Sequence, residues 1–119
     1  MMNSLQNRLV AFSVMIYNTI QPIKNDPLLG HIAEQLIRSS TSVGANYSEA
    51  QSGSSYRDFH AKVRIALKEL REAQYWISFL GATDAKIKNI EVLSSEAEEL
   101  IRIFSTISKK TDPNRTLSH

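Results

Sequence analysis

Cysteine is absent from this 119-residue chain, and proline and glycine are scarce, with three and four residues respectively. The lack of cysteine excludes disulfides and thiolate chemistry, and it fits a reducing compartment. Because helix-breaking residues are so few, long stretches of the chain are free to be helical. A chain of this length supports one domain around one core, and it is too short for two.

Long apolar segments are also missing. The longest uncharged run, Leu9 to Ile23, is shorter than the ~18 residues that a membrane span needs, and polar residues such as Ser13 and Asn18 interrupt it. It lacks the small-residue cleavage site that would end a signal peptide. We therefore expect a soluble cytoplasmic protein with no membrane partner.

A strong excess of one charge is the third feature that the chain lacks, because its net charge is only +2. So small a charge does not by itself require a nucleic-acid partner. The distribution is uneven, however, since residues 57–71 hold five basic and two acidic side chains, whereas residues 91–99 hold four glutamates and no base. We expect one basic face and one acidic helix.

Apolar residues recur every three or four positions in four segments, which predicts four helices. They span residues 4–20, 26–51, 56–80, and a fourth segment that starts between Asp84 and Asn89 and ends near Lys109. Nothing reads as a strand. Because short loops connect successive helices, we predict an all-α, antiparallel, up-down-up-down four-helix bundle over residues 1–110. The polar tail, residues 111–119, is expected to be disordered.

Particular residues mark the predicted helix ends. Asp26 is placed as the N-cap of the second helix, with Pro27 at its first helical position, and Gly81 suits the C-terminal cap of the third. Small residues in the second helix, including Gly44 and Ala45, predict that it packs closely against the third as a helical hairpin.

Catalytic and metal-binding patterns are not found. The histidines are His31, His60 and His119, and a metal site in a bundle would use Glu-x-x-His pairs on facing helices; no such pair occurs after Glu34, Glu49, Glu69 or Glu72. The serines of residues 39–42 lie within a helix with no histidine nearby, so we interpret them as close-packing residues that bond back to the preceding turn. No phosphate-binding glycine loop is present. We predict a non-enzymatic protein with no catalytic residues, no metal and no cofactor.

Polar residues line one face of the second helix and one face of the third. If the turn centres on residues 53 and 54, Arg38 is level with Glu69, Gln35 with Glu72, and Glu49 with Asp58. Two interpretations stay open: a solvated face with weak surface ion pairs, or a partly buried polar seam that fixes helix register or a subunit contact. We favour the seam, which comprises Gln35, Arg38, Ser42, Asn46, Glu49, Glu69 and Glu72.

The third helix carries two further candidate surfaces. Tyr75, Trp76 and Phe79 lie beside its core stripe, and aromatic residues outside a core stripe indicate a subunit interface. Four basic residues, separated by seven, four and three positions, form one stripe about four turns long. This stripe is either a nucleic-acid surface indifferent to sequence or a solvated face on which Lys68 pairs with Glu72. Its members are Arg57, Arg64, Lys68 and Arg71.

Residues 35–80 carry a further pattern, in which a helix that begins with aromatic residues follows a polar helix. Its members are Gln35, Leu36, Arg38, Ser42, Val43, Asn46, Glu49, Phe59, Ala66, Glu69 and Leu70. With these residues the segment resembles the bacterial four-helix-bundle family of ribosomal RNA intervening-sequence proteins, although Ala50 stands where many members have glycine. That family includes the accessory variability determinant of diversity-generating retroelements.

The resemblance implies a closed ring of five bundles around a central channel, with no known cofactor. It also implies, by analogy with the retroelement member, a basic surface and a reverse transcriptase as protein partner. Two functions stay open. The chain is either an accessory factor that binds RNA, DNA or a ribonucleoprotein, or a self-assembling module that binds only protein. A gene adjacent to a reverse transcriptase or inside an rRNA gene would favour the first.

Overall fold

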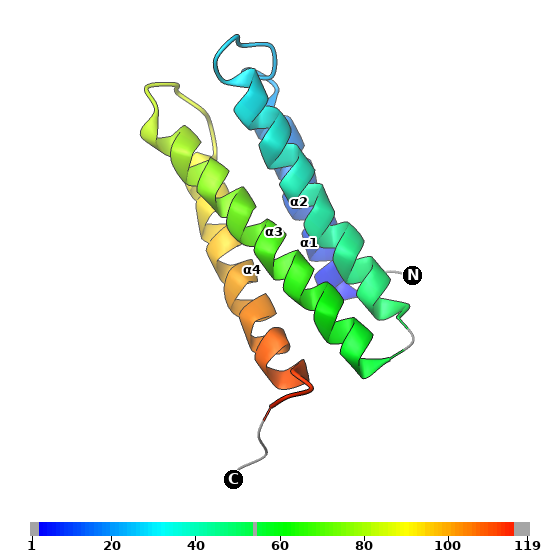
Figure 1. Cartoon of the computed structure of the whole chain (residues 1–119). Coiled ribbons are helices and arrows are strands. Elements are labelled where there is room, and N and C mark those ends of the chain that lie inside the picture. The colour runs from blue at the N-terminus through cyan, green and yellow to red at the C-terminus, as the bar shows by residue number, and fades with distance from the viewer. Residues whose placement is uncertain (1–2, 54, 116–119) are drawn as a thin grey trace.

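The chain folds into four helices joined by short connections (Figure 1). The computed structural model describes residues 3–53 and 55–115, and within these residues no strand is present, which confirms the all-α prediction. The connections α1–α2 and α3–α4 lie at one end of the molecule, and the α2–α3 turn lies at the other. The helices are α1 (Ser4–Ile20), α2 (Gly30–Gln51), α3 (Tyr56–Ala82) and α4 (Ile90–Thr111).

The helices pack mainly as sequential neighbours, with α2 and α3 in the most extensive contact, whereas α1 and α4 touch over a small area. Each helix buries one apolar stripe, to which Phe12, Leu36, Leu70 and Phe104 contribute side chains that are almost fully buried. Such burial stabilises by roughly 25 cal/mol per Å² of apolar surface. The molecule measures 50 × 31 × 22 Å.

Two serines lie in this core. Ser39 and Ser40 are fully buried, and their hydroxyls donate to the carbonyl oxygens of Leu36 and Ile37, both at 3.1 Å. Because each buried hydroxyl is satisfied within its own helix, neither leaves an unpaired polar group in the core. This is the close packing and back-bonding that the sequence predicts.

The start of α2 differs from the prediction. Asp26 Oδ1 accepts hydrogen bonds from the backbone N–H groups of Leu28 and Leu29, at 2.8 and 2.9 Å, so it caps a turn that precedes the helix. The regular helix begins only at Gly30, where a Cβ would lie 2.7 Å from the carbonyl oxygen of Lys24. The prediction of a helix starting at Pro27 is therefore wrong by one turn, because the chain folds back tightly at Gly30.

The connection between α3 and α4 also differs. Gly81 is not a cap, since α3 continues to Ala82 and Thr83 ends it, donating from its backbone N–H and its hydroxyl to the Leu80 carbonyl oxygen. Asn89, with φ of 64°, occupies the left-handed region before α4, and asparagine tolerates that region better than most residues.

At the C-terminal end, α4 extends through Thr111, one residue past the predicted domain boundary at 110. Asp112 Oδ1 then accepts a hydrogen bond from the backbone N–H of Asn114 at 2.9 Å. Residues 116–119 of the predicted tail, His119 included, lie outside the described residues. Among the residues that are described, no helix has the length and apolar content to cross a membrane, and no three His, Asp or Glu side chains gather as metal ligands.

Candidate nucleic-acid interface

The four basic residues of the predicted stripe lie on the outer face of α3, opposite its buried stripe, and all four are exposed. Arg57 and Arg71 are 14 residues apart, which is ~21 Å along a helix that rises 1.5 Å per residue. Within residues 3–53 and 55–115, none of the four makes an ion pair within 4.0 Å. The alternative pairing of Lys68 with Glu72 is not formed, because Glu72 faces Arg38 on α2 instead.

The acidic residues of α4 are partly neutralised from another direction. Arg8 on α1 donates to Glu96 from Nε at 2.8 Å and from Nη2 at 2.9 Å, and Nη2 also lies 3.1 Å from Glu99. These hydrogen bonds, chiefly that to Glu96, raise the pKa of the Arg8 guanidinium. The described ion pairs of α4 glutamates are therefore made with Arg8 of α1, and none of the four stripe residues on α3 pairs with α4.

Arg38 is the centre of the polar seam between α2 and α3. Its Nη1 lies 3.6 Å from Glu69 Oε1, its Nη2 forms an ion pair with Glu72 Oε2, and its Nε donates to Gln35 Oε1 at 3.3 Å. The hydrogen bond to Glu72 is the main cause that raises the pKa of Arg38. The Glu69 side chain is only 16% exposed, whereas that of Arg38 is 48% exposed. The seam is thus partly buried on its α3 side.

The rest of the seam is arranged differently from the predicted levels. Glu49 pairs with Lys62, at 2.9 Å, and this bond raises the pKa of Lys62. The partner is basic and lies one turn beyond Asp58, the residue predicted to be level with Glu49. Asn46 donates to the carbonyl oxygen of Ser42 at 2.9 Å and to its hydroxyl at 3.3 Å. These two residues bond within α2 and form no described hydrogen bond to α3.

The three aromatic residues of α3 do not share one environment. Tyr75 and Phe79 are 62% and 41% exposed, whereas Trp76 is half-buried against the core. The Trp76 Nε1 donates to Glu72 Oε2 at 3.3 Å, and its ring meets that of Tyr75 edge-to-face, with centroids 5.1 Å apart. Tyr75 follows Arg57 by 18 residues, or five helical turns, so the structure places it in line with the basic stripe. A subunit contact through these aromatics stays a prediction.

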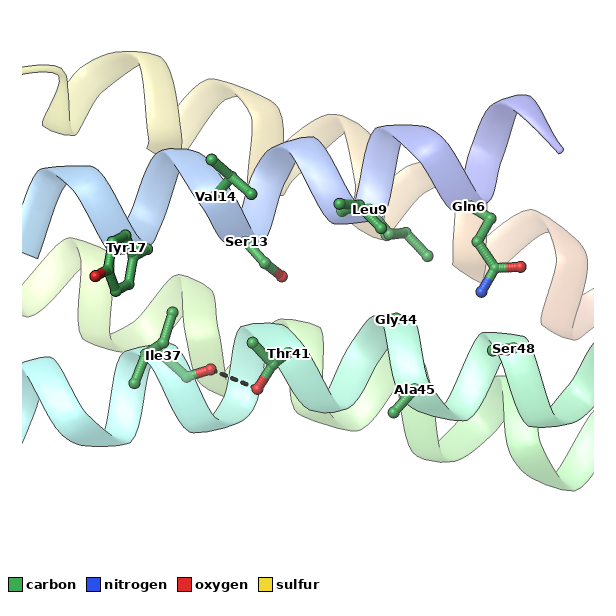
Figure 2. A pocket seen from close by; sticks show the side chains of 11 residues that line it. Gln6, Leu9, Ser13, Val14, Tyr17, Ile37, Thr41, Gly44, Ala45 and Ser48 are labelled. Carbon is green, nitrogen blue, oxygen red and sulfur yellow. Dashed lines mark hydrogen bonds between the residues drawn. The ribbon is translucent and has the colours of Figure 1, made fainter. Parts of the chain in front are cut away.

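Sequence reasoning missed an apolar groove between α1 and α2 (Figure 2). Its volume is about 540 Å³, and no charged side chain lines it. Val10, Val14 and Tyr17 of α1 are exposed along one wall, and Gly44 and Ala45 lie on the wall formed by α2. The prediction that Gly44 and Ala45 pack closely against α3 is therefore wrong, because both line the groove that α2 forms with α1. A Cβ built on Gly44 would lie 3.8 Å from that of Leu9 on α1 and within 4 Å of no α3 atom.

Comparison with known proteins identifies the family. The family model described as 23S rRNA-intervening sequence protein matches residues 4–106, which is most of the chain. The chain belongs to this family. Among solved structures it is similar to a protein of unknown function from the S23 ribosomal protein family of Bacteroides thetaiotaomicron VPI-5482, with 31% identity and a TM-score of 0.79. That match covers 87% of this chain and 97% of the other. Comparison with curated proteins gave no match.

The family assignment confirms the resemblance that residues 35–80 indicated. Four residues of the polar seam lie within this segment, and in the structure they meet at the guanidinium of Arg38. They are Gln35, Arg38, Glu69 and Glu72.

Proposed function

We propose that this member of the 23S rRNA-intervening sequence protein family is a non-enzymatic accessory factor that binds nucleic acid, free or in a ribonucleoprotein, through the basic stripe of α3. One observation carries the proposal. Arg57, Arg64, Lys68 and Arg71 stand exposed in one line, and none of them is paired with an acidic side chain in the described structure. Cations that are not neutralised within their own protein are available to phosphates.

Phosphate contacts of this kind define the binding behaviour that we expect. Each phosphate that the protein neutralises steepens the fall of log affinity with log salt by ~0.9 for duplex DNA, so four contacts give a slope of roughly −3.6. No base-reading motif is recognisable on this face of α3, so we expect binding to be indifferent to sequence. RNA and DNA both present the phosphates that it needs.

We further propose that the four helices form an antiparallel up-down-up-down bundle and that bundles assemble into a closed homo-oligomer, five-fold by the family resemblance. The chain path supports the first part, because consecutive connections lie at opposite ends (Figure 1). A ring would repeat the stripe on each subunit, and linked copies of a modest site bind far more tightly than one copy.

A second candidate is a self-assembling module that binds only protein, and the α1–α2 groove favours it. Covering the groove removes no charge from water, because no charged side chain lines it. We assign it to a second copy, whose α3 carries exposed apolar residues such as Ile65 and Phe79. Joining two different faces of one chain gives a head-to-tail contact, which forms a ring when the rotation from copy to copy closes and an open filament when it does not. A reverse transcriptase, the partner that the resemblance implies, is a further proposal for either candidate.

Fluorescence anisotropy of labelled RNA and DNA at about 50 and about 200 mM salt tests the first candidate. A slope of −3.6 predicts a roughly 150-fold loss of affinity between these two concentrations. The Arg64→Ala/Lys68→Ala variant should bind more weakly and with a shallower slope, because two contacts are lost.

The Lys86→Ala/Lys88→Ala variant is the matched control, since it removes the same charge from exposed loop positions outside the stripe. If the wild type does not bind at the lower salt, the protein-only module is favoured. If both double variants lose affinity equally, nucleic acid binds but the stripe is not the binding surface.

A further inference from the structure

We infer that Tyr75 is a base-stacking platform at the end of the basic stripe, and that it makes this surface select single-stranded nucleic acid over duplex. The inference rests on the proposed function, because it names the class of nucleic acid that the same face of α3 would take. It follows from where Tyr75 lies, from how exposed its side chain is and from how Trp76 packs against its ring.

Tyr75 shares the face of the stripe and adjoins its last cation. It lies four residues, or ~6 Å along the helix, beyond Arg71, and ~27 Å beyond Arg57. At 3.4 Å per nucleotide, that length corresponds to roughly eight stacked nucleotides of one strand. A strand whose phosphates follow the cations therefore brings a base to the tyrosine, whose exposure of 62% leaves its ring open to solvent.

The ring is also held in place, although it is exposed. Trp76 supports it edge-to-face, Glu72 accepts the Trp76 indole hydrogen at 3.3 Å, and Arg38 on α2 pairs with Glu72. A ring already held by its neighbours loses little freedom when a base stacks on it. The polar seam thereby gains a second role, because Arg38 holds Glu72 and Glu72 holds the Trp76 indole against which the Tyr75 ring packs.

Stacking on such a ring distinguishes single-stranded nucleic acid from a duplex. Every base has a π-face that can stack on an aromatic side chain, but in a duplex the paired bases already cover these faces. The major groove of double-stranded RNA is also too deep and narrow for side chains to read its bases. A duplex can therefore use only the four cations, whereas a single strand can use the cations and Tyr75.

The experiment uses Trp76, the only tryptophan of the chain, as a reporter beside the platform. Single-stranded RNA of about ten nucleotides and a duplex with the same number of phosphates are titrated into the full chain, and anisotropy and Trp76 fluorescence are recorded together. The variants are Tyr75→Ala, Tyr75→Phe and, as matched control, Tyr56→Ala. The control removes a tyrosine that is 60% exposed, whose hydroxyl donates to the Lys110 carbonyl oxygen, and that belongs neither to the stripe nor to the groove.

We expect the single strand, and not the duplex, to change Trp76 fluorescence. Tyr75→Ala should lose about five- to 140-fold in affinity for the single strand, the range that stacking of one base gives, and should bind the duplex within about twofold of the wild type. Tyr75→Phe should keep the single-strand affinity, because the ring is what stacks. Tyr56→Ala should bind both nucleic acids as the wild type does.

The outcomes separate this inference from the proposed function. If neither nucleic acid binds, the proposed function fails together with it. If both bind and Tyr75→Ala equals Tyr56→Ala, the stripe stands and the stacking platform is overturned. If light scattering shows that Tyr75→Ala, unlike Tyr56→Ala, dissociates the assembly, Tyr75 belongs to the predicted subunit contact and the inference is overturned as well.

Discussion

At the scale of single residues, the position that organises most of the candidate surface is Arg38. Its guanidinium joins Gln35 on its own helix to Glu69 and Glu72 on α3. A planar fork with five donors suits this task, because it can serve several acceptors in one plane, which the point charge of lysine cannot do equally well. Glu69 Oε1 is buried and accepts no hydrogen bond within the described residues, so the nearby positive charge is its main compensation.

This arrangement predicts a dependence of Glu69 on Arg38. Arg38→Met should lower the free energy of unfolding more than the Arg38→Met/Glu69→Met double variant does, because the single variant leaves a largely buried carboxylate without its cation. Urea unfolding of the two single variants and the double variant measures the coupling. Additive effects would instead show that the two side chains act as independent, solvated groups.

At the scale of elements, the apolar period predicted the helices well and their ends less well. The period of three to four residues is set by the stripe that each helix buries, so Phe12, Leu70 and Phe104 identify their helices without tertiary information. Helix ends depend on local geometry that the period does not carry. At Gly30, where α2 begins, the Lys24 carbonyl oxygen lies so close that a Cβ would not fit. No pattern in the sequence predicts that contact.

The candidate surfaces were predictable to different degrees for the same reason. The basic stripe lies on one helix, so its spacing alone placed it. That Arg38 lies level with Glu69 could be predicted because one short turn joins α2 to α3. The pairing of Glu49 with Lys62 and the groove between α1 and α2 depend on how two helices pack side by side, which the spacing along one helix does not fix.

The capped turn before α2 gives a prediction of pH dependence. Hydrogen bonds from the backbone N–H groups of Leu29 and Leu28 lower the pKa of Asp26 below its ordinary value of 3.8. Because the folded-state pKa is the lower one, the stabilisation is present above about pH 3.8 and is lost as pH falls through the folded pKa.

Asp26→Ala should therefore lower the urea midpoint at pH 7 and have a smaller effect at pH 2.5, because that pH lies below the ordinary pKa of 3.8 and the stabilisation from the carboxylate declines as the pH falls. Chemical denaturation at both pH values measures this difference. An equal loss at the two pH values would mean that the carboxylate charge does not contribute to the cap.

At the scale of the whole molecule, the outer surface divides into regions with different chemistry. The outer face of α3 is basic, Glu96 and Glu99 of α4 pair with Arg8 of α1, and the groove between α1 and α2 carries no charge. In a head-to-tail ring that places Ile65 and Phe79 of α3 in the groove of a second copy, the subunit contact would lie beside the basic stripe on the same helix. Assembly and nucleic-acid binding would therefore use adjoining surfaces of α3, and the assembled form would bind nucleic acid through the stripe residues that the contact leaves uncovered.

The proposed ring predicts that one added charge in the groove disrupts it. Ala45→Glu places a carboxylate on the exposed wall of the groove, where a second copy would have to bury it without a partner, and an unpaired buried charge is strongly unfavourable. The variant should scatter light as a monomer at tens of micromolar, whereas the wild type should scatter as a closed oligomer. Ala11→Glu is the matched control, because Ala11 is exposed on α1 but does not line the groove. It should keep the wild-type mass. A wild-type monomer would refute the ring, and equal dissociation of both variants would place the subunit contact elsewhere than in the groove.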